Sequence, residues 1–62
     1  MAFQMLDVVV LTRDIPEHGL KSGDKGTVIY VHSSDAVCVE FTDDSGGTIA
    51  VADIYSADIR QA

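Results

Sequence analysis

Residues 36–54 read AVCVEFTDDSGGTIAVADI, and this stretch decides the fold. Its first seven residues alternate, so Val37, Val39 and Phe41 point to one side of a strand and the residues between them point to the other. The DDSGG segment at 43–47 is typical of a hairpin turn, because glycine readily adopts the positive φ of tight turns. A second β-rich run follows at 48–54. The stretch therefore predicts two antiparallel strands joined by a tight turn.

Two more β-rich runs lie upstream, at 6–12 and 27–32, and a polar turn at 33–35 leads into the hairpin. Between these runs, the segment 13–26 contains one proline and three glycines and is expected to form a long structured loop, anchored by the apolar side chains of Ile15 and Leu20. The tail at 55–60 allows one 3₁₀ turn and a short last strand. No window has helical periodicity, so no real helix is expected.

Together these elements predict a single all-β domain over residues 1–62. The expected architecture is a five-stranded, strongly bent SH3-like barrel with a long loop after the first strand and one 3₁₀ turn near the C-terminus. Closing the sheet would remove exposed strand edges. Both faces of 49–54 are apolar, so the register of this run is the least constrained; we expect Ala50 and Ile54 to face inward. The side chains expected to face inward are Leu6, Val8, Val10, Leu20, Val28, Val31, Val37, Val39, Phe41, Ala50, Ile54 and Ile59.

Composition narrows the class of protein further. The chain has 62 residues, is 47% hydrophobic, and carries ten acidic and four basic residues for a formal charge of −6. It is too hydrophobic for a disordered acidic tail. It has no apolar run of the length of a membrane span, and its N-terminus lacks the pattern of a signal peptide. A lone Cys38 cannot form an internal disulfide. We therefore expect a soluble cytoplasmic domain.

The segment LKSGDKGTVIYV, from Leu20 to Val31, resembles the glycine-rich turn and second strand of SH3-like barrels, including the KOW modules of ribosomal and transcription proteins. The physical basis is local. Gly23 and Gly26 permit a sharp turn and a close approach of the backbone, and Asp24 can accept hydrogen bonds from turn amides. Together with Gly19, these are the expected structural turn residues.

Taken whole, the chain resembles a family of small bacterial proteins known as a domain of unknown function of the DUF4926 type. The matching stretches are 6–9, 14–20, 23–28, 39–41 and 57–60, and the PEHGL segment is the most specific of them. The resemblance implies an SH3-like fold and a stand-alone bacterial protein. It implies no established activity, although members of this kind often look like accessory genes of mobile elements or of toxin–antitoxin-like pairs.

The residues that carry chemistry form no catalytic or metal-binding pattern. His18, His32 and Cys38 lack the pairwise spacing of metal ligands, and an acidic neighbourhood is expected to raise the pKa of the Cys38 thiol. Asp43 and Asp44 lack the spacing of a calcium loop and are expected to form a solvated turn. Residues 23–26 lack the context of a phosphate-binding loop. We therefore expect no enzyme activity, no metal and no cofactor.

Charge argues against nucleic acid as a partner. The four basic residues are too few to neutralise phosphates, and three of them alternate with carboxylates in 13–25. A protein partner is expected instead, because tyrosines and a structured loop favour interfaces. The expected interaction surface consists of Pro16, Glu17, His18, Tyr30 and Tyr55. The alternative for these residues is that Pro16 and His18 lock the loop and the tyrosines cap the barrel.

The preferred function is therefore a small acidic, non-enzymatic protein-interaction module. In its narrower form it is an antitoxin-like or immunity-like protein, or a mobile-element accessory protein. One alternative is a self-associating structural domain, because the apolar residues on both faces of 49–54 favour a homodimer. Another is an accessory domain of a nucleic-acid-associated complex, because SH3-like barrels serve many purposes.

Overall fold

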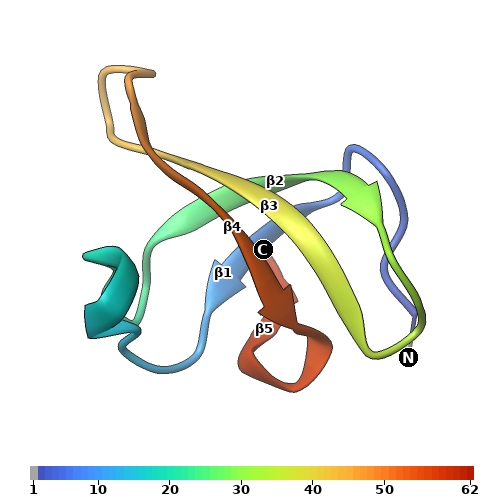
Figure 1. Ribbon diagram of the computed structural model, residues 1–62. Coiled ribbons are helices and arrows are strands. Elements are labelled where there is room, and N and C mark those ends of the chain that lie inside the picture. Colours follow the sequence, from blue (N-terminus) through green and yellow to red (C-terminus); the bar gives the residue numbers. More distant parts are fainter. Residues whose placement is uncertain (1) are drawn as a thin grey trace.

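Five antiparallel strands form one sheet in the computed structural model, which describes residues 2–62 (Figure 1). The sheet order is β4-β3-β2-β1-β5. The expected all-β fold is confirmed, as are its five strands, the long loop after the first strand and the 3₁₀ turn near the C-terminus. A second 3₁₀ turn, η1, lies within that long loop. The elements are β1 (Val8–Leu11), η1 (Pro16–His18), β2 (Lys25–Val31), β3 (Ala36–Thr42), β4 (Thr48–Tyr55), η2 (Ser56–Asp58) and β5 (Ile59–Gln61).

The expected closure of the sheet into a barrel is not formed. Within residues 2–62, β4 pairs only with β3 and β5 pairs only with β1, so each of them is an edge of the sheet. The reason is the path of the chain after β4. The turn η2 carries the chain away from β4, and the three-residue β5 then pairs with β1 through Leu11 and Ile59. The eight residues of β4 therefore keep one side without a strand partner.

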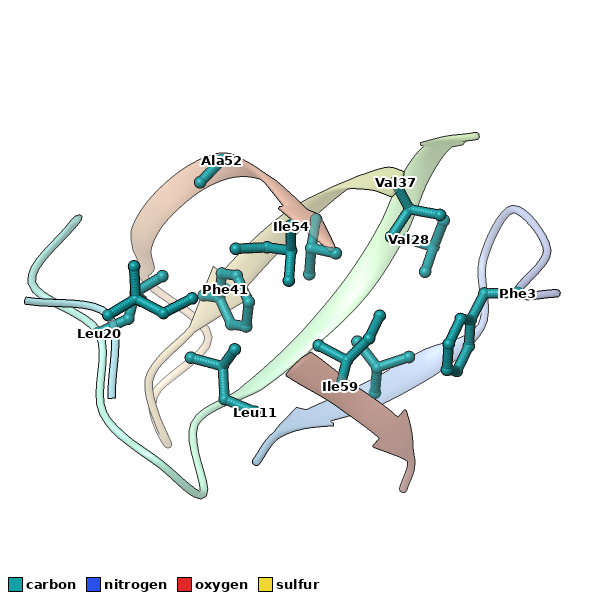
Figure 2. Close-up of a cluster of buried hydrophobic side chains, with 12 residues drawn as sticks. Phe3, Leu11, Leu20, Val28, Val37, Phe41, Ala52, Ile54 and Ile59 are labelled. Atoms are coloured by element: carbon teal, nitrogen blue, oxygen red, sulfur yellow. The ribbon is translucent and has the colours of Figure 1, made fainter. Parts of the chain in front are cut away.

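The core fills the concave side of the bent sheet. Phe41 is fully buried and lies in the middle of the cluster in Figure 2, with Leu11 and Leu20 on one side. An isolated β-bridge joins Ile15 to Leu20 and turns both side chains inward, so the expected anchoring of the long loop is confirmed. The cluster consists of Phe3, Val9, Leu11, Ile15, Leu20, Val28, Val37, Val39, Phe41, Ala52, Ile54 and Ile59.

The expected register of the first strand is wrong by one residue. Val9 and Leu11 face the core, whereas Val8 is 48% exposed and Leu6 lies in a turn before the strand and is 73% exposed. Four consecutive apolar residues offer both faces the same chemistry, so alternation could not select one. Val10 points to the opposite face and is nevertheless buried, at 9% exposure.

The fourth strand has the register that the expected inward set implies, with Ala50 and Ile54 toward the core. Ala52 and Ile54 are buried on the core side, and Ala50 and Val31 pack against the cluster while partly exposed. Ile49 and Val51 are exposed. The core therefore takes the smaller alanines and leaves larger β-branched residues outside, which hydrophobicity alone would not predict.

Three of the four expected turn residues do what their chemistry suggests. Gly19 and Gly23 have φ values of 68° and 94°, in the left-handed region that favours glycine. The Asp24 carboxylate accepts a hydrogen bond from the Lys21 amide at 2.9 Å. The expectation for Gly26 needs correction, because this residue lies inside β2 and not in a turn. It is needed there for close packing, since a Cβ would lie 2.5 Å from Cγ1 of Val39.

Leu6 is the one non-glycine residue with positive φ among residues 2–62, at 72°. Left-handed backbone costs a leucine about 1–2 kcal/mol, and its exposed side chain recovers little of this by burial. We expect Leu6→Gly to raise the free energy of unfolding by about 0.5–1 kcal/mol in urea titrations, after the greater unfolded-state entropy of glycine is subtracted. Leu6→Ala keeps the strain and serves as the control. An equal gain from both substitutions would contradict this explanation.

Candidate functional site

The convex side of the sheet, which we term the outer face, carries the side chains that alternate with the core residues. Directly opposed residues form rows across the strands on this face. One row runs from Asp53 in β4 through Cys38 in β3 to Tyr30 in β2, and the next pairs Tyr55 with Ala36. Because Cys38 and Ala36 are two residues apart on one strand, Tyr30 and Tyr55 share this face. The outer face therefore combines exposed aromatic rings with a carboxylate.

His32 closes a small polar cluster at one end of the outer face. Its Nε2 lies 2.8 Å from Oδ1 of Asp53, although the two residues are 21 positions apart in the sequence. The Tyr30 ring contacts the His32 ring edge to face, with centroids 5.0 Å apart. These contacts link the ends of β2 and β4 across β3, so they hold Tyr30 and Asp53 in defined positions on an otherwise solvated surface.

The pKa of the Cys38 thiol is raised, as expected from an acidic neighbourhood. Partial burial is the larger cause, and the nearby Asp53 carboxylate adds to it by repulsion of the thiolate and by a hydrogen bond to the thiol. The protonated thiol is a poor nucleophile. Partial burial, reinforced by the Asp53 carboxylate, therefore lowers the reactivity of Cys38.

We expect iodoacetamide to alkylate Cys38 more slowly at pH 8 than it alkylates a free cysteine peptide. Asp53→Asn removes the negative charge and should accelerate the reaction several-fold, by shifting the pKa back toward its ordinary value. Asp44→Asn, which makes the same charge change in the β3–β4 turn, serves as the control. A rate unchanged by Asp53→Asn would show that burial alone sets the reactivity.

The structure divides the expected interaction surface into two groups. Pro16, Glu17 and His18 form η1 and are exposed, in the loop that leads to the start of β2. Tyr30 lies near the other end of β2, and Tyr55 ends β4 on that same side. Figure 1 shows η1 at one end of the bent sheet, away from the arrowhead of β2. The tyrosines share a surface with each other and not with η1.

Sequence reasoning missed Asp53, Val51 and His32 as members of a surface. Val51 is exposed on the outer face beside Glu40, whose carboxylate accepts a hydrogen bond from the Thr48 hydroxyl at 2.8 Å. The expected inward set, with Ala50 and Ile54, already leaves Val51 and Asp53 facing outward. No local pattern, however, places these residues and His32 on one surface with the tyrosines.

The net charge of the protein is confined to one part of the chain. Residues 1–25 and 60–62 carry four acidic and four basic side chains and are formally neutral. Arg13 neutralises one of the remaining carboxylates through an ion pair with Asp58 at 3.1 Å, which raises the pKa of Arg13. Residues 26–59 therefore hold the whole formal excess of negative charge, although Lys25 lies opposite Thr42, beside the acidic β3–β4 turn. Residues 26–59 contain no Lys or Arg and six acidic residues, Asp35, Glu40, Asp43, Asp44, Asp53 and Asp58.

An open depression of about 460 Å³ lies between the long loop and the β3–β4 turn. Two of its three carboxylates already accept hydrogen bonds from the local backbone. Asp24 accepts a bond from the Lys21 amide, and Asp43 accepts bonds from the Ser45 and Gly47 amides. No group of three His, Cys, Asp or Glu residues within 2–62 is placed to hold a metal ion. The lining residues are Gly23, Asp24, Lys25, Thr42, Asp43, Asp44 and Ile49.

These features define a small acidic all-β domain with an aromatic and negatively charged outer face. A family model described as a domain of unknown function, DUF4926, matches residues 5–61, and the chain belongs to this family. The resemblance expected from the sequence is thus confirmed. Neither the curated proteins nor the solved structures include a significant match. None of the helices in the described part of the chain has the length and apolar character needed to cross a membrane.

Proposed function

We propose that this chain is a non-enzymatic protein-interaction module whose partner presents a basic surface. The observation that carries the proposal is the confinement of the whole formal charge of −6 to residues 26–59. On the outer face the same region exposes Val51 and Tyr55, whose apolar area favours protein contact over simple solvation. A negative field of this kind steers a positively charged protein toward the face that bears it.

Charge complementarity also favours a basic protein partner over nucleic acid and over a second copy of the chain. Nucleic acid would meet the same negative region, with only four basic residues in the chain to neutralise phosphates. A homodimer formed through this region would bring two copies of it together. The unpaired side of β4 nevertheless favours self-association enough to require a test. Sedimentation at tens of micromolar will show a monomer if the proposal is correct and a dimer if the structural-domain alternative is correct.

The partner search uses the tagged full chain, expressed at native level in its own host and cross-linked before purification. We expect one basic protein to be retained, and to bind again when both proteins are purified, with an association rate that falls as salt rises. Glu17→Lys and Asp53→Lys carry equal net charge and are compared in the reconstitution. Failure to retain any protein that binds again from purified components, or retention of nucleic acid in its place, would overturn the proposal.

The narrower form of the proposal is an antitoxin-like or immunity-like protein that covers the basic active site of a toxin. Its distinguishing prediction is genetic: a gene next to that of this protein encodes a basic, toxin-like protein, and that product is the one that binds. A partner encoded elsewhere, without toxicity when expressed alone, would leave the interaction module in place and remove the antitoxin role. A mobile-element accessory role would be supported by a partner encoded on the same element.

A further inference from the structure

The backbone of β4 has an unsatisfied edge, and the hydrogen bonds given by the structure show which residues form it. The Ser56 amide donates to the Asp35 carbonyl at 2.7 Å, so this pair is a hydrogen-bonded one in the β3–β4 ladder. In an antiparallel ladder, hydrogen-bonded and non-hydrogen-bonded pairs alternate. Ile54 and Ala52, opposite Val37 and Val39, therefore bond to β3. The N–H and C=O groups of the odd-numbered residues of this part of β4, from 51 to 55, point away from β3.

These outward groups belong to Val51, Asp53 and Tyr55, and no strand within residues 2–62 pairs with them, although the Tyr55 carbonyl, as the N-cap of η2, accepts the first bond of that turn. Few of the features that usually keep an exposed edge strand from pairing with another chain are present in β4. From Ala50 to Tyr55 the register with β3 is unbroken, and β4 contains no proline and no lysine. The opposite edge, β5, has only three residues. β4 is therefore the edge best suited to accept an added strand.

The side chains beside this edge specify what the added strand carries. On the outer face, Val51 and Tyr55 are exposed on either side of Asp53, whose side chain is 71% exposed. Residues of an added strand would lie directly opposite these three. A Lys or Arg opposite Asp53 would gain an ion pair, and apolar residues opposite Val51 and Tyr55 would cover their exposed area. The matching pattern is apolar-x-basic-x-apolar.

We infer that the free edge of β4 binds an extended segment of a basic partner protein by strand addition, with the pattern apolar-x-basic-x-apolar facing the row of Val51, Asp53 and Tyr55. This inference rests on the proposed function and names its docking element. Charge selects this occupant over a second copy of the chain, because Asp53 is the one charged residue of β4 and Glu40 lies beside Val51 on β3, so two copies joined through this edge would bring like charges together.

The test uses the full chain labelled with ¹⁵N and a synthetic peptide, KTVTKTVTK, blocked at both ends. We expect the amide signals of Val51, Asp53 and Tyr55 to shift on titration and their hydrogen exchange to slow by about tenfold or more at saturation. Two control peptides separate the contribution of charge from that of backbone hydrogen bonding. ETVTETVTE reverses the charge, and a version of the first peptide N-methylated at its two valines and central lysine keeps the charge but lacks the amide donors. Neither control should bind.

Four variants of the protein complete the test. Asp53→Lys should weaken binding of KTVTKTVTK by about tenfold or more, whereas Glu17→Lys, with the same net charge, should weaken it by about twofold or less. Val51→Pro removes an outward N–H without removing a bond to β3, and it should also weaken binding while the spectrum stays dispersed. Val51→Thr keeps the N–H and should bind.

Several outcomes would overturn the inference. These are no binding of the basic peptide, equal binding of the N-methylated peptide, signal shifts confined to η1, and equal effects of Asp53→Lys and Glu17→Lys. Dimerisation of the free chain with protection of the same three amides would make a second copy the occupant. If a purified basic partner binds and Asp53→Lys has no greater effect than Glu17→Lys, the docking element is wrong and the proposed function stands. If no partner binds, the proposed function fails whatever the peptide does.

Discussion

Replacement of Gly26 by alanine should remove most of the stability of this domain. A Cβ at this position would lie 2.5 Å from Cγ1 of Val39, 2.9 Å from the Glu40 carbonyl oxygen and 3.0 Å from Cδ1 of Phe41. The Val39 and Phe41 side chains are fully buried, and the Glu40 oxygen is backbone, so none can move cheaply. Overpacking of this kind costs about 1–3 kcal/mol or more, in a domain of a size that rarely exceeds about 3–5 kcal/mol in total.

Urea unfolding followed by circular dichroism measures this loss, and Gly19→Ala is the matched control. Gly19 has a positive φ of 68° but open space around its Cβ position, so alanine there should cost only the backbone strain of about 1 kcal/mol. Gly26→Val should leave the chain unfolded. Gly26→Ala with a loss no larger than that of Gly19→Ala would mean that β2 and β3 do not approach as closely as the structure shows.

The second large effect is expected from Phe41→Ala. Phe41 is 0% exposed and lies at the centre of the core in Figure 2, so its truncation removes buried area and leaves a cavity that this small core has few side chains to refill. Losses of about 3–5 kcal/mol are usual for such a change, which equals or exceeds the stability expected for a domain of this size. We expect Phe41→Ala to be largely unfolded at 25 °C, so that its amide NMR signals lose their dispersion.

Two other substitutions serve as controls for the loss of buried volume. Phe41→Leu keeps most of the volume and should remain folded, with a loss of about 1–2 kcal/mol. Tyr55→Ala removes a ring that is 69% exposed and should change stability by about 0.5 kcal/mol or less. A folded Phe41→Ala protein would show that the core of this domain tolerates a void, contrary to the packing described here.

The sequence predicts those parts of the fold where the local residue pattern is compatible with only one conformation. The third strand, 36–42, matches β3 residue for residue, because its apolar side chains alternate strictly. The β3–β4 turn has its positive φ at Gly46, and Asp43 accepts the amide bonds that define it. The first strand is confirmed but its expected register is wrong, because four apolar residues in succession fit either register.

The closed barrel and the interaction surface depend on long-range geometry, which a single sequence does not contain. Whether β5 meets β4 depends on the direction in which η2 leaves β4, and no residue pattern encodes that direction. The five expected surface residues lie at two ends of the sheet, while His32 and Asp53 meet although 21 positions separate them. Local patterns could identify exposed aromatic residues, but not the residues that join them across β3.

Amide hydrogen exchange of the free, monomeric protein tests the central claim most directly, which is that β4 offers an open edge on an acidic interaction module. We predict an alternation along β4, with slow exchange at Ala52 and Ile54, which bond to β3, and fast exchange at Val51, Asp53 and Tyr55, whose N–H groups point to solvent. Equal protection of all five amides in a protein shown to be monomeric would contradict the account, because it would place a strand of the same chain on the edge assigned here to a partner.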